Sequence, residues 1–196
     1  DQPRSRGLGD VYKRQTMERI SGDVQWGFED WFHNEEKSGS VVLDLHVHDL
    51  DFLRYMLGEP DSFQVKASRF ESGMINHIIT EYEFGDVFAT AEGIWDESPA
   101  MKFHAAFRAH FEDATIEFNG AQSPSLTVYK KDGTVETPEL KAEYEGESDV
   151  AGINVSNLGP YYTEIKYFQE CVREDKPVEV LSLIHISEPT RPRLIS

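Results

Sequence analysis

The stretch that decides the fold runs from Val41 to Pro60 and reads VVLDLHVHDLDFLRYMLGEP. Its apolar residues recur at steps of three and four, which is the period of one face of an α-helix. They are Leu43, Val47, Leu50, Leu53 (with Met56 beside it) and Leu57. The loop SGS precedes this pattern, and Gly58 followed by Pro60 is a typical helix stop. We therefore predict a helix from Ser38 to Gly58.

Polar residues form a second stripe along the same predicted helix. Asp44, His48, Asp51 and Tyr55 lie at i, i+4, i+7 and i+11, beside the apolar face. His46 is not part of this polar stripe. Acids and imidazoles at this density indicate a metal site, an acid–base pair or a solvated helix face, and the secondary structure decides among them.

The metal interpretation requires a strand. On a strand, Asp44, His46 and His48 would share one face, as in the H-x-H arrangement of metal-dependent amidohydrolases, and could bind one zinc ion. The helical spacing continues without a break after His48, however, and the barrel that carries such sites needs about 250 residues. A metal-dependent hydrolase fragment is therefore the weaker alternative.

On a helix, Asp44 and His48 can touch, and the carboxylate would orient the imidazole and raise its pKa. Such a histidine can accept a proton from a hydroxyl group near neutral pH, which the oxidation of an alcohol requires. A charged surface face with no chemistry, on a binding or assembly domain, is the other possibility.

After Pro60 the period changes to two, which is typical of β-strands. The segments SFQVKASRF, IITEYEF, VFATAEGIW, KFHAAFRAHF, ATIEF, LTVYK and TVET are joined by short turns such as Gly85-Asp86 and Lys131-Asp132-Gly133. A last helix follows, with Pro160 in its first turn and an apolar stripe of Tyr161, Ile165, Phe168 and Val172. We predict an α+β fold, an antiparallel meander sheet with helices on one face.

Composition narrows the class of protein further. The chain has 196 residues and a formal net charge of −17, which argues against nucleic acid as a partner because phosphates would be repelled. No run of eighteen apolar residues and no secretory leader is present, so neither a membrane nor secretion is indicated. A single cysteine, Cys171, fits a reducing compartment, and we expect a cytoplasmic protein.

The two ends of the chain are related to each other as DNA. Gln15 as CAG is the reverse complement of Leu181 as CTG, and the relation continues outward to Asp1 and Ile195 without a failure. We therefore expect residues 1–15 and 181–196 to be translated sequencing-adapter DNA. Residues 16–180 would then be a truncated substrate and oligomerisation domain, and we leave both tails out of the argument about fold.

The segment WFHNEEKSGSVVLDLHVHDLDFLRYMLGEP resembles the Gfo/Idh/MocA family of nicotinamide-dependent oxidoreductases. It matches the part of that family where a Trp and a small-residue loop precede D-x-x-x-H-x-x-D on a helix that ends in Gly. YYTEIKYFQECVREDKPVEV resembles the later family helix with its Lys-Pro exit. The meander between the two helices agrees with the second domain of the family.

The resemblance implies a role for each matching residue. Asp44 and His48 match the catalytic pair, with His48 as general base or acid and Asp44 as its orienting partner. Asp51 matches the acid after the histidine, and His46 stands where the family often has a small residue. With Trp31, these two are expected on the substrate side. No metal ligand is expected.

The resemblance also implies what lies outside this chain. No G-x-G-x-x-G follows a strand, so the Rossmann domain of the family and its Glu-Lys-Pro segment are expected to be absent. NAD or NADP would be the cofactor of the parent protein, and none is expected to bind this fragment, which would be inactive by itself. The expected substrate is a small sugar, polyol or related hydroxyl compound. The expected partner is a second copy of the chain, bound through the sheet face.

Overall fold

The computed structural model describes residues 14–139 and 159–176. The chain divides into two compact units, Asp1–Leu140 and Lys141–Ser196. The second unit contains one helix in its described part, α3 (Gly159–Glu174), with Pro160 in the first turn as expected. The side chains of Ile165, Phe168 and Val172 on this helix are exposed.

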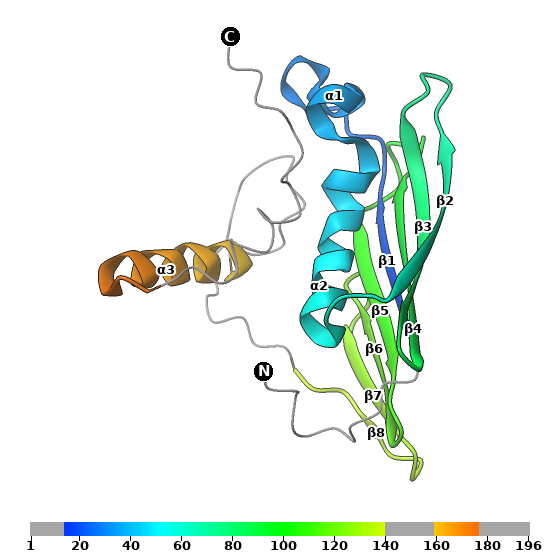
Figure 1. Ribbon diagram of the computed structural model, residues 1–196, viewed down its shortest axis with the longest axis vertical. Coiled ribbons are helices and arrows are strands. Elements are labelled where there is room, and N and C mark those ends of the chain that lie inside the picture. Colours follow the sequence, from blue (N-terminus) through cyan, green and yellow to red (C-terminus); the bar gives the residue numbers. More distant parts are fainter. Residues whose placement is uncertain (1–13, 140–158, 177–196) are drawn as a thin grey trace. The chain divides into compact units, whose positions relative to one another are not determined.

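The first unit is built on a mixed sheet of eight strands in the order β2-β3-β4-β1-β5-β6-β7-β8. The strands are β1 (Arg14–Ser21), β2 (Ser62–Arg69), β3 (Ile75–Phe84), β4 (Val87–Trp95), β5 (His104–His110), β6 (Ala114–Asn119), β7 (Leu126–Lys130) and β8 (Val135–Glu136). The long helix α2 (Val47–Leu57) lies along one face of this sheet (Figure 1). The α+β prediction is confirmed.

Strand β1 is the element that the alternation of apolar residues does not reveal. It lies in the middle of the sheet, parallel to β4 and antiparallel to β5, and joins the two meanders β2–β4 and β5–β8. Its covered face carries Gln15, Met17 and Arg19, so two of these three positions are polar and the usual strand pattern is broken. The sheet is therefore mixed, with one parallel pair.

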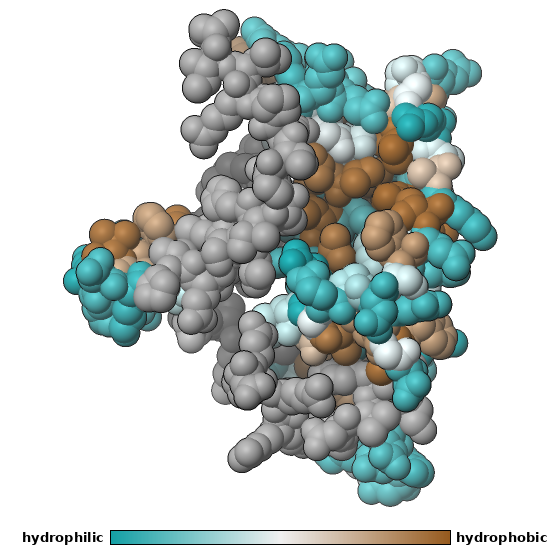
Figure 2. All heavy atoms as spheres, viewed as in Figure 1, coloured by the Kyte–Doolittle hydropathy of each residue, from teal (hydrophilic) through white to brown (hydrophobic). Residues whose placement is uncertain are grey.

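The core lies between the sheet and the helical segment that precedes and includes α2. One buried cluster joins Leu53 of α2 to β1, β3 and β4, and consists of Met17, Leu53, Tyr82, Ala89 and Ala91. A second cluster lies under the start of the helical segment and consists of Val41, Leu45, Met74, Ile78 and Trp95. In Figure 2 apolar side chains gather along the middle of the described part, where α2 and the neighbouring strands lie.

The predicted helix is present, but its first part is not α-helical. Val42–His46 form a π-helical turn that continues directly into α2, and Gly58 ends the helix with a φ of 88°. The wider turn changes the phase of the apolar face, so Val41 and Leu45 are buried and Leu43 keeps an exposed fraction of 37%. The predicted stripe is therefore correct within α2 and wrong at Leu43.

The chain enters this helix through a short strained loop. The helical turns η1 (Phe28–His33) and α1 (Glu35–Ser38) precede it, and Gly39 and Ser40 both adopt a positive φ, of 73° and 63°. The left-handed conformation costs a non-glycine residue about 1–2 kcal/mol. Buried Ser40 is held by hydrogen bonds at both of its ends: its N–H donates to Ser38 Oγ at 3.0 Å, and its Oγ accepts from Val42 N at 3.4 Å.

Strand β1 begins at Arg14, inside the segment that the DNA relation assigns to an adapter. Backbone pairing requires no particular side chains, so Arg14 and Gln15 can extend the strand whatever their origin. The rest of both expected tails lies outside the described residues. The boundaries at residues 15 and 181 therefore stay predictions.

Candidate active site

Asp44 lies in the π-helical turn and faces the end of strand β4. Its Oδ2 accepts a hydrogen bond from the indole Nε1 of Trp95 at 3.2 Å. Burial raises the pKa of Asp44, whereas the hydrogen bond from Trp95 and the nearby His48 and Arg19 lower it. Trp95 packs in the core and also fixes the carboxylate of Asp44.

His48 lies in the first turn of α2, and its side chain remains accessible to solvent. The protein packed around the imidazole lowers its pKa, and the positive charge of Arg19 lowers it further. Asp44, Asp49 and Asp51 act in the opposite direction. The net effect is a lowered pKa, whereas Asp44 alone would raise it. His48 is therefore neutral at pH 7 and can accept a proton.

Asp44 and His48 stand on successive turns of one continuous helical segment, four residues apart. Among the described residues the hydrogen bond to Asp44 comes from Trp95, and none joins Asp44 to His48. The two side chains interact through their charges. A proton acceptor that solvent can reach, beside a carboxylate with a fixed position, is an arrangement suited to general acid–base chemistry.

His46 points into the molecule rather than toward solvent, with an exposed fraction of 4%. Its Nε2 lies 3.0 Å from both the Tyr82 hydroxyl and the Thr80 hydroxyl on β3, while its Nδ1 is buried without a partner among the described residues. Burial lowers the pKa of His46. His46 packs against the sheet instead of sharing a strand face with Asp44 and His48, so the H-x-H chelate is not formed.

The other two expected substrate-side residues lie at different places. Asp51 is partly buried on α2, and its Oδ1 has no partner within the described ranges. Trp31 lies in η1, packs edge-on against Phe32 with ring centroids 4.9 Å apart, and keeps an exposed fraction of 39%. Phe32 in turn packs edge-on against Trp95 at 6.1 Å. Trp31 is therefore separated from Asp44 by Phe32 and Trp95, whose indole donates to the carboxylate.

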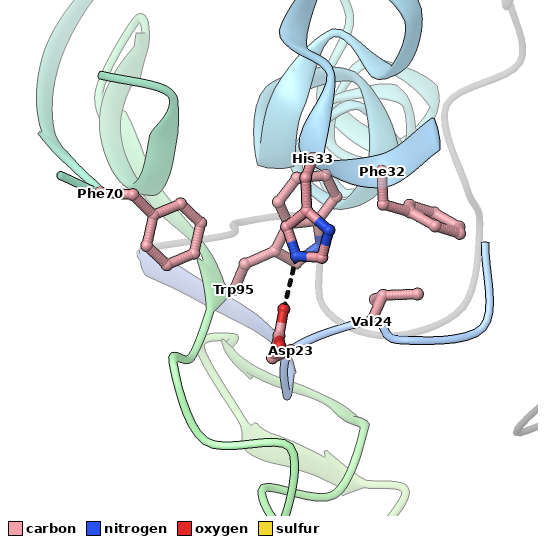
Figure 3. Close-up of a pocket in the computed structure, with 6 residues that line it drawn as sticks. All are labelled: Asp23, Val24, Phe32, His33, Phe70 and Trp95. Carbon is pink, nitrogen blue, oxygen red and sulfur yellow. Dashed lines mark hydrogen bonds and ion pairs between the residues drawn. The ribbon is translucent and has the colours of Figure 1, made fainter. Parts of the chain in front are cut away.

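A small pocket lies beside Trp95 (Figure 3). It is lined by Asp23, Val24, Phe32, His33, Phe70 and Trp95, and its enclosed volume of about 10 Å³ has room for about one water. His33 Nε2 lies 2.7 Å from Asp23 Oδ1, and the hydrogen bonds to Asp30 and Asp23 raise the pKa of His33. A pocket this small cannot hold a sugar as it stands.

Arg19 and Asp49 form an ion pair that the sequence does not reveal. Arg19 Nη2 and Nε donate to Asp49 Oδ1 at 2.8 and 3.2 Å, which joins β1 to α2. Asp49 is buried, and its Oδ2 has no partner among the described residues. The two residues are far apart in the chain, so no local pattern indicates the pair. A prediction of strand β1 from the sequence would have placed Arg19 on the buried face, and a buried cation needs an acidic partner.

The comparisons agree with this arrangement of elements. The model of the GFO/IDH/MocA C-terminal domain matches residues 4–136, which is more than half of the chain. The chain belongs to this family of C-terminal domains, as the D-x-x-x-H motif indicated. The match begins within the expected N-terminal tail.

A curated relative is 1,5-anhydro-D-fructose reductase from Ensifer adhaerens, which is 25% identical over 135 residues. The match covers 67% of this chain and 38% of that protein. This chain therefore spans well under two thirds of the relative.

Solved structures share the fold at low identity. Levoglucosan dehydrogenase in complex with NADH and L-sorbose has a TM-score of 0.66 and 16% identity, over 86% of this chain and 52% of that one. UDP-N-acetylglucosamine 3-dehydrogenase from Acidithiobacillus ferrooxidans has a TM-score of 0.62 and 16% identity, over 88% and 48%. An oxidoreductase from Agrobacterium radiobacter in complex with NAD+, L-tartaric acid and magnesium has a TM-score of 0.67 and 13% identity, over 93% and 54%. This chain spans about half the length of each.

The described residues contain neither a cluster of metal-ligand side chains nor a membrane-spanning helix. Within residues 14–139 and 159–176, no three His, Cys, Asp or Glu side chains gather as metal ligands. In the same ranges no helix is both long and apolar enough to cross a bilayer.

Proposed function

We propose that this chain is the substrate-handling part of an NAD- or NADP-dependent oxidoreductase that acts on a hydroxyl group of a sugar, polyol or related compound. Family membership and the three sugar-related enzymes named above support the class of reaction. The observation that carries the proposal is the placement of Asp44 and His48 on successive helical turns, with Asp44 held by Trp95. A π-helical turn is rare, and it is frequently found at functional sites.

The part of the chemistry that belongs to this chain is the transfer of the proton. His48 is neutral near pH 7 because its surroundings lower its pKa, so it can take the proton of the substrate hydroxyl as the carbon is oxidised. Asp44 then stabilises the imidazolium that forms, since its charge favours the protonated state of His48. In the reverse direction His48 returns the proton to the carbonyl oxygen.

When bound, a nicotinamide cofactor would supply the hydride acceptor for this oxidation. The described residues do not form its cradle, because none of the described strands opens through a glycine-rich turn onto a helix N-terminus. We place the dinucleotide site in the remainder of the parent protein, with residues 1–15 and 181–196 as adapter-derived tails around a truncated domain. The chain by itself would then be inactive.

Enzyme assays on the complete gene, recovered from genomic DNA around Thr16–Val180, test the proposal. NAD(P)H formation with a panel of sugars and polyols should be seen in the wild type and should fall by roughly a hundredfold or more in His48→Ala. His110→Ala is the matched control, because His110 lies on the opposite face of the sheet and bonds only Thr115 Oγ1 among the described residues. Wild-type turnover in His48→Ala would instead favour a non-catalytic binding or assembly domain.

We also propose a second copy of the chain as the partner of the sheet face opposite α2. That face mixes charges of both signs, with Lys66 on β2 and the carboxylates of Glu18 and Glu92. Glu18 bonds His104 at 2.8 Å, and Glu92 bonds His77 at 2.7 Å. Exposed Phe88 and Tyr129 lie on the same face. A face with both signs of charge and exposed rings can be complementary to itself, as a two-fold interface requires.

A further inference from the structure

Arg19 occupies a position beside the proposed acid–base pair. On β1 it lies opposite Gly93 of β4, on the face of the sheet that the helix covers. A Cβ built on Gly93 would lie 3.3 Å from His46 Cβ and 3.5 Å from Val41 Cγ2, so the helical segment approaches the sheet closely at this point. The charge of Arg19 acts on both Asp44 and His48.

The Arg19 guanidinium is held in place, but not all of its N–H groups are used in hydrogen bonds. It has five N–H donors, and the two bonds to Asp49 use Nε and one hydrogen of Nη2 on a single carboxylate oxygen. Among the described residues Nη1 has no partner. The Asp49 side chain has an exposed fraction of only 6%, while that of Arg19 is 23%, so the pair is anchored on a buried carboxylate and the Arg19 side chain keeps some contact with solvent.

We infer that Arg19 is a substrate-binding residue, whose unused N–H groups donate to a hydroxyl oxygen of the same substrate that gives its proton to His48. This inference rests on the proposed function. Asp49 is the positioning residue that holds the guanidinium in place, so the ordering of a long side chain has already occurred when the substrate arrives.

The local balance of charge selects the class of substrate. Asp44, Asp49 and Asp51 surround His48, and Arg19 is the only described cation that acts on its pKa. A substrate with a carboxylate or phosphate would meet an excess of negative charge. A neutral polyhydroxylated compound can accept from Arg19 and donate to a carboxylate, so the neutral class is favoured over its acids.

NMR on the full 196-residue chain tests this without a cofactor. The Arg19 Nε–H and Trp95 Nε1–H resonances are followed during titrations with D-sorbitol, myo-inositol and D-glucose as neutral probes, and with D-gluconate as an anionic probe. We expect at least one neutral probe to shift both resonances in parallel, and D-gluconate to bind at least tenfold more weakly. Tighter binding of D-gluconate would overturn the assignment of a neutral substrate.

The variant Arg19→Met/Asp49→Leu removes both members of the pair, so no buried charge is left without a partner. The neutral probe should then bind at least tenfold more weakly, as read at Trp95. Arg108→Met/Glu117→Leu, an ion pair on the opposite face, is the control and should bind as the wild type does. Wild-type affinity in the first variant, or a response of Trp95 without one of Arg19, overturns the role of Arg19 and leaves the proposed function standing. No response of either resonance to any probe contradicts both.

Discussion

His46 and His48 stand two positions apart and occupy opposite environments. His46 is enclosed between helix and sheet beside two hydroxyls, whereas His48 reaches solvent beside several carboxylates. The pKa is lowered in both, chiefly because the protein packed around each imidazole displaces water, almost completely at His46 and partly at His48. For His48 the consequence is a neutral base near pH 7, and for His46 it is a dependence of stability on pH.

The free energy of unfolding should decrease as pH falls below 6.5 because of His46. Its pKa in the folded protein lies below the value of 6.5 for an unperturbed histidine, so below pH 6.5 the unfolded chain binds a proton that the folded chain does not. Stability from this residue is complete above pH 6.5 and is lost as pH falls toward the pKa of the folded state. Urea unfolding at pH 7.5 and 5.5 should show a smaller loss in His46→Asn than in the wild type. Equal losses in both proteins would contradict the prediction.

Gln15 should be a destabilising residue in its present position. It is buried with an exposed fraction of 1%, on the same face as Met17, and its Nε2 has no partner among the described residues. A buried polar group without a hydrogen bond costs about 1–3 kcal/mol. Gln15→Leu should therefore raise the free energy of unfolding by about 1 kcal/mol, whereas Gln64→Leu on exposed β2 should change it little. A loss of stability in Gln15→Leu would show that the amide has a partner after all.

Within the candidate site, the placement of some residues could be predicted from the sequence and that of others could not. Asp44 and His48 are four residues apart within one helix, so the local sequence is enough to predict that their side chains lie on neighbouring turns. Arg19 and Asp49 are separated by thirty positions, and their pairing depends on how β1 inserts beside β4. The burial of His46 depends on the phase of the π-helical turn, which the apolar spacing did not indicate.

Among the elements, the π-helical turn determines where Asp44, a residue of the candidate site, lies. It packs against Gly93, the residue of β4 that has no side chain to separate strand from helix. The strands from β2 to β8 and α2 could be predicted because their apolar residues repeat with periods of two and of three to four. Strand β1 could not, because the polar side chains of Gln15 and Arg19 lie on its buried face.

Gly93→Val should displace the helical segment from the sheet. The new side chain would meet His46, Val41 and Ile78, and excess volume in a packed core costs about 1–3 kcal/mol. Chemical unfolding should show this loss, and the Trp95 Nε1–H resonance should move because its acceptor Asp44 moves. Thr90→Val, at a position of β4 that faces away from the helix, is the control. An unchanged Trp95 resonance in Gly93→Val would contradict the role assigned to the close approach.

For the molecule as a whole, the predicted self-association can be tested by substitution on each face of the sheet. Phe88 has an exposed fraction of 50% on the face opposite α2, and Phe63 has one of 64% on the side of α2. Sedimentation velocity should show that Phe88→Glu dissociates an oligomer and that Phe63→Glu does not, because a charge buried in an apolar contact opposes association. A monomeric wild type, or equal effects of the two changes, would exclude the sheet face as the interface.

The most direct test of the account is a double-mutant cycle on Asp44 and His48 in the complete enzyme. Turnover is measured for the wild type, Asp44→Asn, His48→Ala and the combination. If the two side chains act as one acid–base unit, each single change lowers turnover by roughly a hundredfold or more, and the double variant is no slower than the slower single variant. Losses that multiply, or single variants that keep wild-type turnover, would show that Asp44 and His48 do not act as one acid–base unit.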